Sequence, residues 1–172
     1  IVPGILVEGA GIPDVMRGEE TQLVGAVAAE ETAVAVLPGT HSKWARIERG
    51  AVVDFATFLT GELYAVLMNH SILGRMASAD PGTPGPAFER GAQTGLVSEA
   101  LTHDLFGART LALAGALAAH EVADWLSGLL IGAEIRAAKK WVRAPGLPVR
   151  IIGADALALR YERALAMPSA RS

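Results

Sequence analysis

The sequence contains no cysteine, few aromatic residues and only a small net charge. Without cysteine the chain forms no disulfide, no thiolate nucleophile and no cysteine-ligated metal site, and this composition fits a reducing cytoplasm. A net charge of −3 gives no reason to expect nucleic acid or an anionic membrane surface as a partner. Apolar runs such as Trp125–Ala133 are far shorter than the ~20 residues of a membrane span, so we expect no membrane partner.

What the sequence does contain is a globular composition. Its 172 residues are 51% hydrophobic and 19% charged, which is enough for one substantial core and too apolar for a disordered chain. Hairpin-like strands are mixed with crossover helices. This mixture predicts an α/β fold in which a mixed sheet with antiparallel hairpin strands is flanked by helices.

The stretch 33–62 organises the chain. Ala33–Leu37 is an apolar run of strand length, and Lys43–Ile47 and Ala51–Leu59 follow it with many β-branched and aromatic residues. Pro38-Gly39 and Arg49-Gly50 separate the three runs, so we expect three strands joined by two hairpin turns.

Apolar periodicity and capping residues predict the remaining elements. Asp14–Gly18 is interpreted as a connection into the first helix, and Gly128 and Gly132 would allow another element to approach the long helix closely. The predicted segments are a broken strand at Ile1–Val7, helices at Glu19–Ala29, Gly61–Leu73, Ala87–Leu101, His120–Lys140 and Asp155–Ala166, an ambiguous segment at Leu105–Leu117 and a short strand at Val149–Ile152.

The first of the two turns carries side chains that suit a phosphate. Residues 38–43 read Pro-Gly-Thr-His-Ser-Lys, and backbone N–H groups around the glycine can form an anion-binding concavity. Two hydroxyls, an imidazole and an ammonium add further donors. The composition alone also fits an ordinary polar hairpin turn, so both interpretations are open at this point.

Three motifs in one order resemble the 2-dehydro-3-deoxygalactonokinase family. They are VMRGEETQLVGA at 15–26, LPGTHSKW at 37–44 and DFATFLTGELYAVL at 54–67, and the resemblance extends from the first residue to about Ala166. It implies the two-lobed actin/hexokinase-like ATPase fold, whose lobes are ribonuclease H-like. It also implies phosphorylation of the terminal hydroxyl of 2-dehydro-3-deoxy-D-galactonate, with ATP, Mg²⁺ and the sugar acid as ligands.

The resemblance places the catalytic carboxylate near the start of the first helix. Glu19 lies nearest the expected position of the base, Glu20 is the second candidate, and Asp14 is a third, either as base or as a ligand to a magnesium-bound water. Arg17 could grip the substrate carboxylate with two hydrogen bonds, or simply neutralise the neighbouring glutamates. Taken alone, acids at this position are also ordinary partners of a helix dipole.

The same resemblance implies a nucleotide site in two turns. Residues 38–43 correspond to the second phosphate-binding hairpin of the superfamily, and Ile151–Asp155 resembles its adenosine-binding turn. At the next helix start Thr60 and Glu62 could face a substrate anion, although a Thr60 N-cap would also explain them. The expected nucleotide-binding residues are Gly39, Thr40, His41, Ser42, Lys43, Gly153 and Ala154; no metal-ligating set is expected.

Two motifs of the family are not found in the sequence. A first phosphate hairpin is not found upstream of Glu19, and a Gly-Asp-Thr-like stretch is not found after Ala166. We therefore expect residues 1–30 to form the end of an N-terminal lobe with an interdomain helix, and residues 31–172 to form the C-terminal kinase lobe. The activity of the chain alone and a homo-oligomeric state are left open.

Two other functions compete with the kinase interpretation. With half of the phosphate clamp missing, the chain could be a non-catalytic module that binds a nucleotide or a sugar acid. A hydrolase that uses His41 or Ser42 ranks last, because the sequence has neither a G-x-S-x-G elbow nor an evident acid to orient the histidine.

Overall fold

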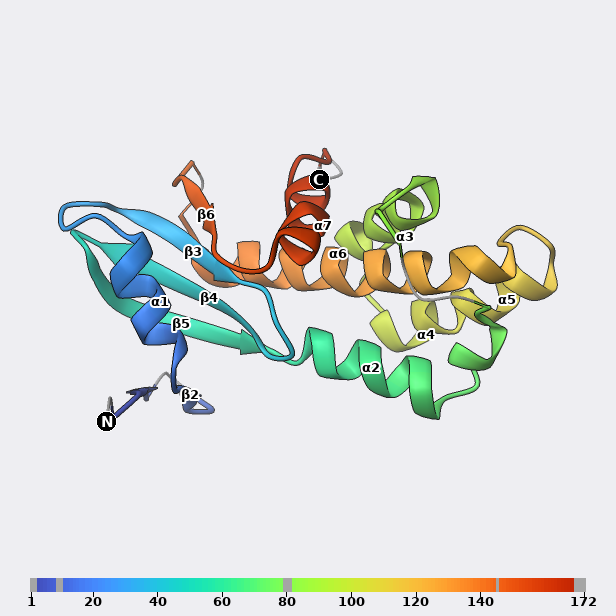
Figure 1. Ribbon diagram of the computed structural model, residues 1–172, viewed down its shortest axis with the longest axis horizontal. Helices are drawn as coiled ribbons and strands as arrows, with labels where there is room; N and C mark the ends of the chain where they lie inside the picture. The colour runs from blue at the N-terminus through green and yellow to red at the C-terminus, as the bar shows by residue number, and fades with distance from the viewer. Residues whose placement is uncertain (1–2, 9–10, 79–81, 145, 169–172) are drawn as a thin grey trace.

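The computed structural model describes residues 3–8, 11–78, 82–144 and 146–168. The molecule is elongated, with a β-sheet towards one end and a group of helices towards the other (Figure 1). Helix α6 (Val122–Val142) runs along most of the long axis and contacts both parts.

The central sheet has four strands in the order β5-β4-β3-β6. Strands β3 (Ala33–Leu37), β4 (Ser42–Glu48) and β5 (Ala51–Phe58) are joined by hairpins, and β6 (Val149–Ile151) pairs parallel to β3. The two predicted hairpins and the mixed sheet are thus confirmed. Arg49 and Gly50 both have positive φ, as expected of a two-residue hairpin turn that matches the strand twist.

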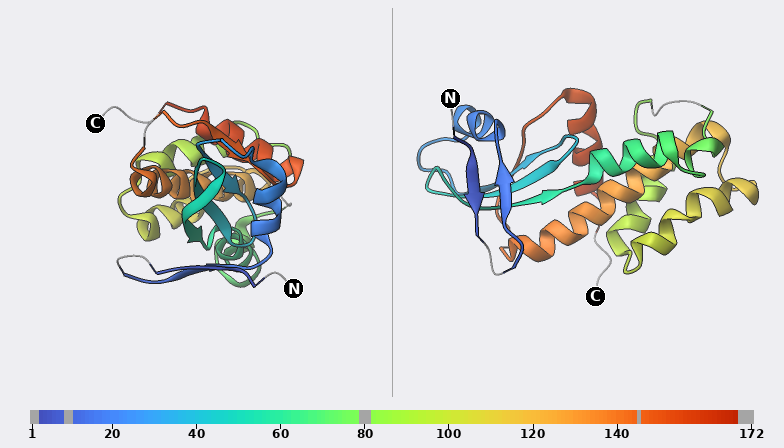
Figure 2. Two further views of the ribbon diagram at one scale, coloured as in Figure 1. Left: turned by 90° about the vertical axis from the view of Figure 1, so that its left-hand side faces the viewer. Right: turned by 90° about the horizontal axis from the view of Figure 1, so that it is seen from below.

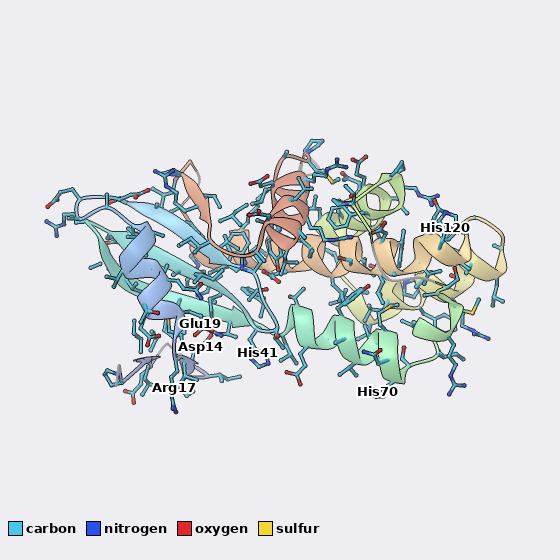
Figure 3. The ribbon with its side chains drawn as sticks, viewed as in Figure 1. Asp14, Arg17, Glu19, His41, His70 and His120 are labelled. Atoms are coloured by element: carbon cyan, nitrogen blue, oxygen red, sulfur yellow. The ribbon has the colours of Figure 1, made fainter. Side chains whose placement is uncertain are left out.

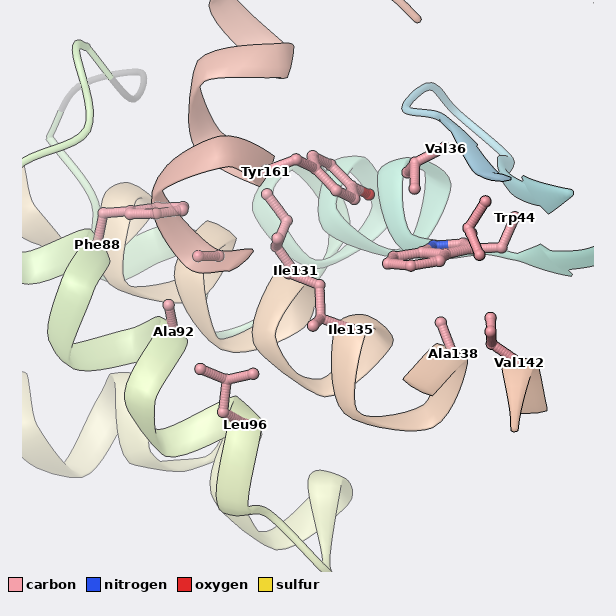
Figure 4. Packing of buried hydrophobic residues seen from close by; sticks show 12 residues of the cluster. Val36, Trp44, Phe88, Ala92, Leu96, Ile131, Ile135, Ala138, Val142 and Tyr161 are labelled. Atoms are coloured by element: carbon pink, nitrogen blue, oxygen red, sulfur yellow. The ribbon is translucent and has the colours of Figure 1, made fainter. Parts of the chain in front are cut away.

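Each face of the sheet buries a different set of side chains. Val36 and Trp44 point towards α6 and α7 (Asp155–Leu165), where Figure 4 shows them with residues of α6. On the opposite face, Ala35 and its neighbours pack against Met16 and Leu23. Burial on both faces explains why β3 is a continuous apolar run rather than an alternating one.

The N-terminal residues cover that opposite face. Strands β1 (Ile5–Val7) and β2 (Asp14–Met16) form a small antiparallel sheet, and β2 contacts β5 (Figure 2). Helix α1 (Glu19–Ala26) follows this small sheet in the chain. Residues 14–18 lead into α1 as expected, but the strand β2 within them was not predicted. A three-residue strand is too short to show periodicity, and its pairing depends on a partner beyond a glycine-rich link.

The other end of the molecule is helical. The predicted helix Ala87–Leu101 is divided, because α3 ends at Val97 and a separate α4 begins at Leu101. The segment Leu105–Leu117, which the sequence left ambiguous, contains the helix α5. The elements here are α2 (Thr60–His70), η1 (Gly74–Met76), α3 (Pro86–Val97), α4 (Leu101–Leu105), α5 (Gly107–Leu113) and η2 (Ala119–Glu121).

Helices α3 and α6 approach each other so closely that only glycine fits at the crossing. A Cβ at Gly128 would lie 2.1 Å from the carbonyl oxygen of Phe88, and one at Gly132 would lie 2.3 Å from that of Ala92. The predicted close approach at these two glycines is therefore confirmed.

Substituting Gly132→Ala should lower the free energy of unfolding by about 2 kcal/mol or more, because the backbones must separate to accommodate the methyl group. Denaturant unfolding followed by circular dichroism measures this change. Gly25→Ala in α1 is the matched control, since nothing lies within 4 Å of its Cβ position. The control should be neutral or slightly stabilising, and equal losses in both variants would contradict the steric explanation.

Candidate active site

Two turns lie side by side at one edge of the sheet. Because β3 and β6 are parallel, the turn 38–41 that follows β3 and the turn at Gly153 and Ala154 that follows β6 leave from the same edge. A Cβ at Gly153 would lie 3.4 Å from Cδ of Pro38, so the two turns are in contact. Ligands of α/β proteins commonly bind outside the carboxyl ends of such strands.

The start of α2 closes against the first of these turns. The backbone N–H of Glu62 donates to the carbonyl oxygen of Thr40 at 2.9 Å. A Cβ at Gly61 would lie only 2.3 Å from the carbonyl oxygen of Gly39, so this contact requires glycine. The three segments that were predicted to hold a nucleotide or substrate are thus brought together.

A small cavity of about 140 Å³ opens between the first of these turns, the start of α2 and the helices α6 and α7. It is smaller than the roughly 300–1,000 Å³ of typical ligand pockets, so the described residues provide at most part of a nucleotide site here. Its lining residues are Gly39, Thr60, Gly61, Tyr64, Ser127, Leu130, Ile131, Leu157, Arg160 and Tyr161.

Lys43 connects the turn to the start of α1. Its side chain is almost fully buried, its Nζ lies 3.3 Å from Oε1 of Glu19, and it donates to the carbonyl oxygen of His41 at 3.3 Å. Partial burial acts to raise the pKa of Glu19, but its hydrogen bonds and the ammonium of Lys43 outweigh burial and hold that pKa below its ordinary value. Glu19 is therefore an ionised, partly exposed carboxylate next to the predicted phosphate turn.

Asp14 lies near this ion pair but is already engaged. Its Oδ2 accepts from the backbone N–H of Thr57 at 2.6 Å, and its Oδ1 accepts from the Thr57 hydroxyl at 2.6 Å. Thr57 stands opposite Lys43 in the β4–β5 pairing, so both side chains lie on the same face of the sheet. These bonds fasten β2 to β5, the outer strand of the sheet. Figure 3 shows Asp14 next to Glu19.

The other two predicted residues at this helix start have different surroundings. Glu20 is 7% exposed, and its Oε2 accepts from the backbone N–H of Gly18 at 2.6 Å. Its Oε1 is buried with no hydrogen-bond partner among the described residues. Arg17 is exposed, and its backbone N–H donates to Glu19.

His41 does have an acidic partner, contrary to the sequence-based expectation. Its Nε2 lies 2.5 Å from Oε2 of Glu62, and both side chains are about half exposed. The partner was missed because it is supplied by α2. The adjacent Ser42 faces the interior, where its hydroxyl is fully buried 2.8 Å from that of Tyr161, so the pair does not form an exposed nucleophile and base.

A buried polar network lies behind the two turns, and the sequence analysis did not identify it. Glu134 of α6 is 3% exposed; its Oε1 accepts from Nε1 of Trp44 at 2.7 Å and its Oε2 accepts from the Tyr161 hydroxyl at 2.8 Å. The Thr60 side chain also interacts with this carboxylate and acts to lower its pKa. The available signal was a lone acid between apolar residues on a helix.

The predicted N-cap at Thr60 was wrong. The N-cap residue of α2 is Leu59, no side chain caps this end, and Thr60 is the first helical residue. Its side chain instead interacts with Glu134, a residue of a distant helix that local sequence patterns do not reveal.

Replacing Glu134 with glutamine should change how stability depends on pH. Burial raises the pKa of Glu134 above its ordinary 4.5, although hydrogen bonds from Thr60, Trp44, Tyr161 and Ser42 oppose the rise. A carboxyl group whose pKa is raised by folding stabilises the folded state fully at pH values below its ordinary pKa of 4.5. This stabilisation is lost as the pH rises through the pKa of the folded state. The stability of the wild type relative to Glu134→Gln should therefore be greater at acid than at neutral pH.

Chemical unfolding of both proteins across this pH range measures the difference. Other titrating groups are common to the two proteins and cancel in the comparison. A difference that is constant with pH, or one that grows towards neutral pH, would contradict the buried-carboxylate assignment.

Two further properties concern the described residues as a whole. No helix among them is long and apolar enough to cross a membrane. They also contain no group of three or more histidine, aspartate or glutamate side chains that could hold a metal ion.

Comparison with solved structures identifies the class of protein. The chain is similar to a crystal structure from Sinorhizobium meliloti described as a 2-dehydro-3-deoxygalactonokinase, with a TM-score of 0.84 and 35% identity. The match covers 94% of this chain and 55% of the other. The fold is therefore similar to part of a sugar-acid kinase.

The family model described as 2-keto-3-deoxy-galactonokinase matches residues 1–171, and the chain belongs to this family. It is 38% identical over 164 residues to 2-dehydro-3-deoxygalactonokinase of Escherichia coli (strain K12), which covers 95% of this chain and 56% of the relative. It is also 42% identical over 143 residues to DgoK1 of Rhizobium meliloti (strain 1021), which is named for the same activity. That match covers 80% of this chain and 47% of the relative. The chain spans about half the length of these relatives.

Proposed function

We propose that this chain contributes to ATP-dependent phosphorylation of the terminal hydroxyl of 2-dehydro-3-deoxy-D-galactonate. In this proposal residues 31–172 are the C-terminal, actin-like lobe of the kinase, and residues 1–30 connect it to an N-terminal lobe. The observation that carries the proposal is the ion pair between Lys43 and Glu19, because it joins the predicted phosphate turn to the predicted catalytic carboxylate.

Glu19 is the base in this proposal. The substrate hydroxyl attacks the γ-phosphorus of ATP, its proton passes to the Glu19 carboxylate, and the bond to the leaving ADP breaks. Because the pKa of Glu19 is held below its ordinary value, the carboxylate is ionised at neutral pH, which is the form that a proton acceptor must have. The engagement of Asp14 with Thr57 and the burial of Glu20 favour Glu19 over these alternatives.

The nucleotide is proposed to lie along the edge formed by the two turns. Gly39 and Thr40 would approach its phosphates through backbone N–H groups, with Lys43 supplying positive charge. Gly153 and Ala154 at the start of α7 would face the adenosine. His41 would contact phosphate as a donor, while Ser42 would support the turn from behind.

The sugar acid is proposed to bind on the α1 side of this edge. Arg17 is exposed and is the candidate for gripping the substrate carboxylate. Thr60 and Glu62 are weaker candidates for substrate contact, because Thr60 interacts with Glu134 and Glu62 pairs with His41.

Magnesium fits this site only as a companion of the nucleotide. Protein-bound Mg²⁺ commonly retains waters and uses one or two carboxylates together with substrate phosphates. The carboxylates available for such a role are Glu19 and Asp14, of which Asp14 already accepts two hydrogen bonds from Thr57. The ion would neutralise charge on the transferring phosphoryl group.

The test is a phosphoryl-transfer assay on the protein as its gene encodes it, with MgATP and 2-dehydro-3-deoxy-D-galactonate. We expect ADP release that depends on the sugar acid, and a phosphate ester at the terminal carbon by NMR. The epimeric 2-dehydro-3-deoxy-D-gluconate serves as the specificity control. Nucleotide binding without transfer to either acid would overturn the kinase proposal and favour the non-catalytic binding module, an alternative suggested by the chain's half-length match.

A further inference from the structure

The buried carboxylate of Glu134 is bonded to three elements that border the proposed nucleotide site. Thr60 is the first residue of α2, and Tyr161 belongs to the helix that follows the Gly153 turn. Ser42 is part of the phosphate turn, residues 38–43, and is the first residue of β4. Tyr161 donates to Glu134 at 2.8 Å, and its hydroxyl lies 2.8 Å from the Ser42 hydroxyl. One carboxylate on α6 thus ties together segments that are far apart in the sequence.

The network lies in a core whose other side chains are mostly apolar. Figure 4 shows Tyr161 and Trp44 on the side of α6 that carries Ile131 and Ile135, in a core whose labelled residues are otherwise apolar. A buried charge is costly unless several donors satisfy it, and replacing such groups with apolar ones is often neutral or stabilising. The arrangement therefore requires an explanation other than stability.

Each donor to Glu134 fixes both a distance and a direction. On β4, Nε1 of Trp44 donates to Oε1 of Glu134 at 2.7 Å. On α7, the Tyr161 hydroxyl donates to Oε2 of Glu134 at 2.8 Å. Apolar contacts allow neighbouring elements to slide, but a set of short hydrogen bonds to one rigid carboxylate does not. The hydrogen bonds of Glu134 therefore fix the distance between the phosphate turn and the turn before α7.

We propose that Glu134 is a positioning residue for nucleotide binding, which sets the relative placement of the phosphate turn, the start of α2 and the turn before α7. The inference rests on the proposed function, since it takes this edge to be the nucleotide site. Glu134 itself is 3% exposed and acts through Ser42, Thr60 and Tyr161 rather than by touching the ligand.

Two variants disturb the network with little change in volume. Glu134→Gln replaces one acceptor oxygen with an NH₂ group, which must then face the Trp44 N–H or the Tyr161 O–H. Tyr161→Phe removes the hydroxyl that links Glu134 to Ser42. Ile135→Val is the matched control, because Ile135 is the next residue on α6, is fully buried in the same core and has no polar group.

The measurements are the Kd for MgADP by calorimetry, and the KM for ATP, KM for the sugar acid and kcat, on the protein as its gene encodes it. In both network variants we expect the Kd for MgADP and the KM for ATP to rise about tenfold, since small displacements of positioning groups have large effects. The KM for the sugar acid should change less than about twofold. The double variant should be little worse than either single one, because both act on one network.

Several outcomes would overturn the inference. Folded network variants with wild-type nucleotide affinity would do so, as would an equal loss in Ile135→Val or an equal rise in the KM for the sugar acid. If Glu134→Gln does not fold, Tyr161→Phe, which removes a single oxygen atom, decides the question. A wild-type protein that does not bind MgADP would overturn the proposed function and this inference together, whereas normal binding in all variants overturns this inference alone.

Discussion

Replacing Glu19 with glutamine should lower kcat by about 100-fold or more while leaving nucleotide binding in place, because proton acceptance by a positioned carboxylate contributes on this scale. Glutamine keeps the size of the side chain and an oxygen that can still accept from the Arg17 backbone N–H. It cannot take up the hydroxyl proton. Steady-state phosphoryl transfer and calorimetric binding of MgADP, both on the protein as its gene encodes it, separate these two effects.

The matched control is Glu20→Gln, the same substitution at the next residue. Glu20 is buried and bonded to the backbone of Gly18, so we expect this variant to lose stability more than kcat. Asp14→Asn should instead loosen the attachment of β2 to Thr57. Near-normal kcat in Glu19→Gln, together with a large loss in either of the other two variants, would move the base to that residue.

Replacing Lys43 with methionine should weaken ATP binding by about 10- to 100-fold, the range expected for loss of a charge-assisted hydrogen bond to phosphate. Methionine retains most of the buried stem and removes only the ammonium that lies between Glu19 and the turn. The Kd for MgATP and for MgADP, measured by calorimetry, gives the effect. A larger loss for ATP would indicate that Lys43 reaches the γ-phosphate.

Lys140→Met is the control for the lost charge, because Lys140 is exposed in the last turn of α6 and is not one of the residues of the proposed site. It should bind nucleotide as the wild type does. Unfolding of Lys43→Met must be measured as well, since Glu19 loses its cationic neighbour in this variant. Unchanged nucleotide affinity in a folded Lys43→Met protein would mean that residues 38–43 form an ordinary polar hairpin turn.

The elements of this fold that depend on local patterns were predictable. The β3–β4–β5 hairpins follow from β-branched strands separated by Pro-Gly and Arg-Gly turns, and α6 follows from its apolar periodicity. The errors occurred where a distant partner decides the outcome. The β1–β2 pairing depends on two three-residue strands meeting across a link, and Thr60 interacts with Glu134 instead of capping its own helix.

The phosphate turn illustrates the same division at the level of single residues. The sequence places Ser42 and Lys43 next to each other, and both were predicted to face a nucleotide. Because side chains alternate along β4, they lie on opposite faces: Ser42 joins the interior network and Lys43 meets Glu19. Which of the two faces the proposed site depends on the register of β4.

By itself, the sequence determined the local elements, the order of the motifs and the membership of the family that those motifs indicate. The tertiary structure alone decided which polar side chains meet, namely Lys43 with Glu19, His41 with Glu62, and Glu134 with Trp44 and Tyr161. Hydrogen bonds and charges act over a few ångströms in space regardless of separation along the chain. Local patterns therefore predict strands and helices, but only the packing of α6 and α1 against the sheet brings these partners together.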